Sequence, residues 1–100
     1  MTPTHPAESV ARTIAEAAQG RRAAELQRVP EALRPLLQDL PERPRQLLIG
    51  ALSDLMLDTP ELFERRRGLA LGMIYMAGKY DSLPPAAVGA LVGYVQDLPA

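Results

Sequence analysis

Apolar and polar residues along this chain recur with the spacing of α-helices. An α-helix turns by about 100° per residue, so apolar residues three and four positions apart lie on one face. Such spacing runs through most of the chain, and no segment alternates between apolar and polar residues for long enough to predict a strand. The sequence therefore predicts an all-α fold, an irregular antiparallel bundle of four to six helices.

Prolines divide the chain, and each division predicts the start of a helix. Proline is favoured at the first helical position because its missing N–H would have no partner there. The helical segments predicted from these prolines and from the apolar spacing are 7–19, 21–28, 31–40, 41–57, 60–79 and 84–96. Residues 1–6 are expected to form a flexible tail and residues 7–100 a single helical domain, with 41–57 and 60–79 at its centre.

The first predicted helix has an apolar face that includes Val10, Ile14 and Ala17. This pattern loses its phase at Gly20, because a continuous helix would place Arg21 on the same face. We therefore expect a break or kink at Gly20, with one continuous helix as the alternative.

Long stretches near the C-terminus contain no charged side chain. A helix that faces water normally carries charge on its outer face. Residues 83–96 do not, and the face opposite their Val and Leu residues consists of Ala86, Gly89, Ala90 and Gly93. These small residues predict either tight packing within one chain or contact with a second chain.

Residues 68–78 form a second uncharged stretch, in which Gly68, Gly72 and Tyr75 lie opposite the main apolar stripe. Small residues four positions apart let two helix backbones approach closely, within a chain or between chains. Tyr75 is a candidate interface residue, because an aromatic side chain among small residues can anchor a partner.

Arg66 is the charged residue that conflicts with the helical pattern, because it falls on the apolar stripe near Leu62 and Leu69. Three interpretations remain open. Its aliphatic stem could lie along the bundle with the guanidinium in water. It could pair with Asp54 or Asp58 inside the bundle, or it could contact a phosphate or carboxylate of a partner.

Composition and charge exclude several classes of function. The 100 residues have a formal net charge of −1 and no cysteine, so disulfides, thiolate metal sites and thiol nucleophiles are excluded. Acidic residues lie among the arginines at helical pair spacing, as Glu8 and Arg12 do, which is typical of a face in water. A strongly basic nucleic-acid surface is therefore not expected.

Candidate catalytic residues are few and scattered. The one histidine, His5, lies in the predicted tail, and no serine has a histidine near it in sequence. The acidic pairs Asp54 with Asp58 and Glu61 with Glu64 are explained by helix capping and by the dipole at a helix start. We predict no catalytic, cofactor-binding or metal site, and hence no enzyme.

The N-terminus has no signal-peptide pattern, and no uncharged stretch reaches the roughly 20 residues that span a membrane. We expect a cytoplasmic chain without membrane contact. The favoured function is a small non-enzymatic protein-interaction or regulatory subunit that binds through helix faces, as a homodimer or with another protein. The alternative is an accessory nucleic-acid-binding protein that uses scattered arginines: Arg21, Arg22, Arg65 and Arg66.

Overall fold

The computed structural model describes residues 6–57 and 59–99. The described chain is all α, as the apolar spacing predicted, and its helices are α1 (Pro6–Arg28), α2 (Arg34–Leu37), α3 (Glu42–Asp54), α4 (Phe63–Tyr80) and α5 (Pro85–Asp97). Two short 3₁₀ turns, η1 (Glu31–Leu33) and η2 (Pro60–Leu62), come directly before α2 and α4. Of the predicted tail, residues 1–5 lie outside the described residues, and Pro6 is the first residue of α1.

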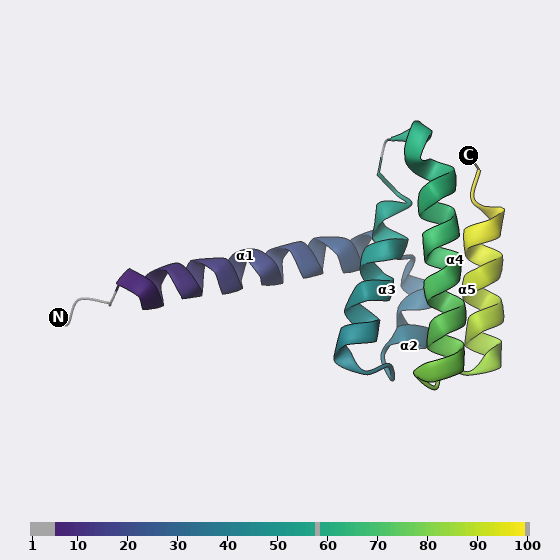
Figure 1. Ribbon diagram of the computed structural model, residues 1–100, viewed down its shortest axis with the longest axis horizontal. Helices are drawn as coiled ribbons and strands as arrows, with labels where there is room; N and C mark the ends of the chain where they lie inside the picture. The colour runs from purple at the N-terminus through teal and green to yellow at the C-terminus, as the bar shows by residue number, and fades with distance from the viewer. Residues whose placement is uncertain (1–5, 58, 100) are drawn as a thin grey trace.

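Helices α3, α4 and α5 lie side by side with short connections, whereas α1 extends away from them (Figure 1). Helix α3 packs against α1 and α4, and α4 packs against α3 and α5, so the two helices predicted to be central are central. The projecting helix lengthens the molecule. Its radius of gyration is 16.4 Å, against about 13 Å for a compact domain of this length.

The hydrophobic core lies between α2, α3, α4 and α5. Its largest fully buried apolar side chains come from these helices and from the residue that follows α1: Val29, Leu37, Leu48, Leu52, Ile74, Leu91 and Val95. No side chain in residues 7–28 is buried. The core therefore begins where α1 ends.

Helix α1 is one continuous helix, so the expected break at Gly20 does not form. A glycine inside a helix costs about 1 kcal/mol relative to alanine, which weakens a helix but does not end it. The predicted apolar face is also not a core face, because Val10 is 58% exposed and Ile14 is 62% exposed. The pattern changes phase because the two halves of α1 have different surroundings, the second half lying against α3.

The predicted helix 31–40 is another difference. It forms only the turn η1 and the single-turn helix α2. Pro35 lies in the first turn of α2, where its missing N–H is tolerated. A longer helix through this position would place the proline in the interior, where it costs about 3 kcal/mol.

Prolines precede helical elements, as predicted: Pro30, Pro41 and Pro84 are the N-cap residues of η1, α3 and α5. None of the three makes a side-chain cap bond, so the fixed φ of proline sets the direction of each start. Asp58, which the sequence suggested as a helix cap, lies outside the described residues. Thr59 is the N-cap of η2 but makes no side-chain cap bond.

Gly78 is the glycine at which two helices meet closely. A Cβ added at Gly78 would lie 2.8 Å from Val88 Cγ2, where α4 packs against α5. Real Cβ atoms do not approach another atom so closely, and the β-branched side chain of valine has few rotamers to move into. The pairing of α4 with α5 therefore depends on the missing side chain at this position.

We predict that Gly78→Ala lowers the free energy of unfolding by about 1–3 kcal/mol, because the new methyl group overpacks the contact with Val88. Gly89→Ala is the matched control, since an added Cβ there meets nothing within 4 Å. It should raise the stability by about 0.5–1 kcal/mol through helix propensity. Urea denaturation followed by circular dichroism measures both, and equal effects of the two variants would contradict the close contact.

Candidate functional site

An apolar groove of ≈ 600 Å³ lies between α3 and α4, and we call it the α3–α4 groove. Its exposed apolar side chains are Leu47 from α3 with Leu69 and Met76 from α4, which are 53%, 56% and 56% exposed. Gly68 and Gly72, which also belong to α4, line the groove as well. Large apolar side chains gathered on a surface in this way are typical of an interaction site.

Unlike Gly78, the α4 glycines Gly68 and Gly72 do not serve packing within the chain. A Cβ added at Gly68 or Gly72 would meet nothing within 4 Å, and the same holds for Gly89 and Gly93 in α5. Tight packing within one chain, one of the two explanations offered by the sequence, is therefore wrong for these four positions. The missing side chains at these glycines leave open surface instead.

The structure brings only part of the predicted interaction set together. Gly68 and Gly72 line the α3–α4 groove, whereas Tyr75 is exposed on α4 without lining it. The small residues of α5 lie on a separate helix, with three of them exposed and Gly93 half-buried: Ala86, Gly89, Ala90 and Gly93. The groove residues Leu47, Leu69 and Met76 were not predicted as a site, because each fits the apolar stripe of its own helix.

The first half of α1 is the second unusual surface. Every side chain in residues 7–17, which we call the arm, is exposed. Figure 1 shows that the arm leads away from the other helices. Val10 and Ile14 are four residues apart and so share one face of the arm. The arm therefore presents to solvent the kind of apolar stripe that usually packs against another helix.

A polar hollow of ≈ 500 Å³ lies between α1 and the start of α3. Arg21, Arg22 and Arg43 line it together with two acidic residues, Glu25 and Glu42. Acidic groups among the arginines weaken any attraction for a polyanion such as nucleic acid. This hollow therefore gives no support to the nucleic-acid alternative.

Arg66 lies at the opposite end of α3. One of its Nη atoms donates to the backbone oxygen of Asp54, at 3.4 Å, and to the hydroxyl of Thr59. Pairing with the Asp54 carboxylate, one of the three interpretations left open by the sequence, is therefore replaced by a contact with the Asp54 carbonyl, and Asp58 lies outside the described residues. A cation at the end of a helix is favourable because the last carbonyl groups carry partial negative charge.

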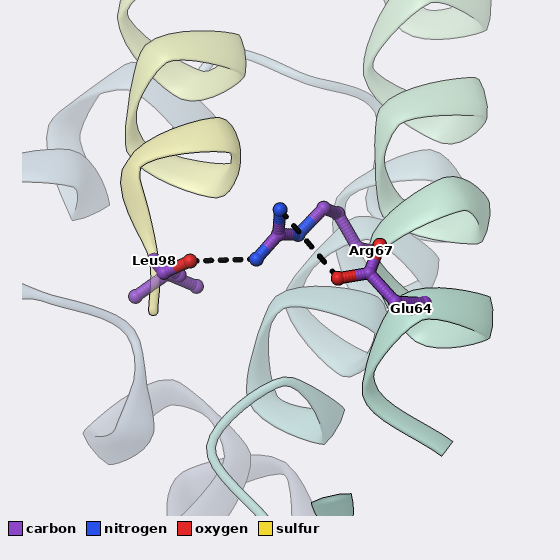
Figure 2. A network of polar contacts seen from close by, with 3 residues as sticks. All are labelled: Glu64, Arg67 and Leu98. Atoms are coloured by element: carbon purple, nitrogen blue, oxygen red, sulfur yellow. Dashed lines mark hydrogen bonds and ion pairs between the residues drawn. The ribbon is translucent and has the colours of Figure 1, made fainter. Parts of the chain in front are cut away.

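Arg67 joins α4 to the end of α5, a role that the sequence did not reveal because helical spacing places Arg67 beside the apolar stripe of α4 rather than on it. Its Nη2 donates to the backbone oxygen of Leu98 at 2.6 Å, and its guanidinium lies 4.6 Å from the centre of the Phe63 ring. Its Nη1 lies 3.7 Å from a carboxylate oxygen of Glu64 (Figure 2). Arg67 lies four residues after Phe63 and three after Glu64, and side chains at these spacings are neighbours on a helix. This spacing could have indicated the two local contacts from the sequence.

Tyr94 has a structural position as well. Its hydroxyl donates to the sulfur of Met56 at 3.5 Å. Burial raises the pKa of this hydroxyl above its ordinary value of 10.0, because the charged form would lose its hydration. Tyr94 is therefore neutral at physiological pH and links α5 to the residues after α3.

The described residues contain neither a metal-binding cluster nor a membrane-spanning helix. In residues 6–57 and 59–99, no three His, Cys, Asp or Glu side chains gather in a way that could hold a metal ion. Among the helices that the structure describes, none combines the length and the apolar character needed to cross a membrane. Comparison with models of protein families, with curated proteins and with solved structures finds no match.

We predict that Arg67→Met lowers the free energy of unfolding by about 1–3 kcal/mol, because the charge-assisted hydrogen bond to Leu98 is lost. Backbone amides in the last turn of α5 should also exchange faster with deuterium. Arg65→Met is the control. Arg65 is exposed, so its replacement should change the stability by less than about 0.5 kcal/mol. Equal exchange in both variants would show that Arg67 does not hold α5.

Proposed function

We propose that this chain is a small non-enzymatic protein-interaction subunit that self-associates through helix faces. The observation that carries the proposal is the arm, in which every side chain of residues 7–17 is exposed, Val10 and Ile14 among them. An apolar stripe on a projecting helix is a binding surface of the kind that docks into the groove of a partner.

The stability of the arm itself supports a partner. Most of the stability of a helix in a protein comes from the packing of its apolar face rather than from helix propensity. The arm is rich in alanine, a strong helix former, but none of its side chains is buried against the bundle. Packing against another chain would supply the stability that the arm does not obtain from its own bundle.

Self-association is favoured over a different partner because the chain carries two complementary apolar surfaces. The arm is a helix without a groove, and the α3–α4 groove has no helix in it. Closed homodimers are the commonest assemblies of soluble proteins. We place this activity in the cytoplasm as part of the same proposal, which agrees with a sequence that has no cysteine.

The nucleic-acid alternative has less support. Arg66 is engaged at the end of α3, and Arg21 and Arg22 line the hollow at its other end. A phosphate-binding surface needs several free basic side chains on one face. The four candidate arginines do not lie together in that way.

We predict a dimer at micromolar concentrations when light scattering is measured on the chain as it elutes from a size-exclusion column. The double variant Val10→Gln with Ile14→Gln should elute as a monomer of 10.9 kDa. Glutamine is a good helix former, so the arm keeps its helix and loses only its apolar stripe.

Ala15→Gln is the matched control, because position 15 lies off the stripe formed by Val10 and Ile14, and this variant should remain dimeric. A monomer for the unaltered chain would overturn the proposed self-association. A dimer that is indifferent to the double variant would show that the arm is not the binding surface.

A further inference from the structure

We infer that the arm of one protomer binds in the α3–α4 groove of a second copy, and that the two copies exchange arms reciprocally. The inference rests on the proposed self-association and adds where the arm docks. Four features of the chain support it: length, shape, charge and the direction of α1.

The length of the arm matches the length of the groove. At about 1.5 Å per residue, the 11 residues of the arm extend over about 16 Å. The groove follows α4 from Gly68 to Ala77, which corresponds to about 14 Å on the same scale. One arm therefore fills one groove.

The shapes of the two surfaces are complementary. Val10 and Ile14 form a ridge with a spacing of four residues, and Gly68 and Gly72 form a notch with the same spacing. Ridges and grooves in the rows of every fourth residue are the surfaces that interlock when two helices pack. Because an added Cβ at Gly72 meets nothing within 4 Å, the notch has room for a side chain of the arm.

The charges of the two surfaces are also complementary. The arm carries Glu8 and Glu16 against Arg12, a net charge of −1. Arg43 lines the groove, and two further cations, Arg65 and Lys79, share the outward face of α4 with Gly68 and Gly72 at helical spacing. With Asp81 at the groove and Glu64 on the same face of α4, this set has a net charge of +1. Opposite charges around an apolar contact favour this pairing over others.

The direction of α1 makes the contact intermolecular. The arm leads away from α3 and α4 (Figure 1), so it cannot reach the groove of its own chain while α1 remains a straight helix. Arg43 and Leu47 line both the hollow at α1 and the α3–α4 groove, so the groove adjoins the base of the arm. Two copies related by a two-fold axis can therefore each extend an arm into the groove of the other.

Chemical cross-linking tests the location directly, because the chain has no cysteine of its own. Cysteine is small and apolar, so Ile14→Cys keeps an apolar side chain on the arm and Gly72→Cys fills the notch far less than glutamine does. The two variants place one thiol at the middle of the arm and one at the middle of the groove. A short bifunctional thiol reagent should join the two variants when they are mixed, and mass spectrometry should identify the 14–72 product. Ala90→Cys, on the exposed face of α5, is the control and should not be joined to Ile14→Cys.

The outcomes separate the inference from the proposed function. A 14–72 product supports the exchange of arms. A dimer whose arms are joined only to each other, or to position 90, overturns docking in the groove and leaves the self-association intact. A chain that is monomeric by light scattering overturns both.

A second measurement does not depend on cross-linking. Gly72→Gln fills the notch and should weaken the dimer by about tenfold or more, because the arm loses its fit. Gly89→Gln gains the same helix propensity on an exposed face of α5 and should leave the dimer affinity unchanged. Equal affinities of the two variants would contradict docking over Gly72, even where the protein is dimeric.

Discussion

The apolar core that α2, α3, α4 and α5 bury is the interaction on which this small bundle depends, and arginine side chains close the ends of its helices. The last carbonyl groups of a helix have no partner within it, and no glycine of this chain has the positive φ that often closes a helix. Arginines donate instead at the ends of α1, α2, α3 and α5: Arg34 to Gln27 and Val29, Arg45 to Gln38, Arg66 to Asp54 and Arg67 to Leu98. Within residues 6–57 and 59–99, the one non-glycine residue with a positive φ is Ser82, which follows α4 and has a φ of 63°.

The eleven basic residues do not make a strongly basic surface, because twelve acidic residues are interspersed with them along the chain. Arg28 adds a further structural contact, since its Nη1 donates to the hydroxyl of Ser53, which is fully buried. Five arginines make contacts of this kind. Others stay on the surface beside acidic groups, as Arg21, Arg22 and Arg43 do in the polar hollow. The proposed function, contact with another protein chain, rests on the arm and the α3–α4 groove.

The site was only partly predictable from the sequence. Gly68 and Gly72 were singled out because small uncharged residues on an outer helix face depart from the normal pattern, and both line the α3–α4 groove. Leu47 and Met76 were missed because both fit the apolar stripe of their own helix. The spacing of an apolar residue along a helix is the same whether another helix covers that residue or leaves it exposed. The arm was missed for the same reason, since its stripe of Val10 and Ile14 predicted a core face.

The sequence by itself determined the all-α class and the main helices, because helical periodicity and the fixed φ of proline act over a few neighbouring residues. Gly20 was a weak local signal, and the continuous α1 shows that one glycine does not outweigh the helix on both sides of it. Only the tertiary structure decided which apolar faces are covered, where Arg66 and Arg67 donate, and that α4 meets α5 at Gly78. Those outcomes depend on residues distant along the chain, and a local pattern carries no information about which of them will meet.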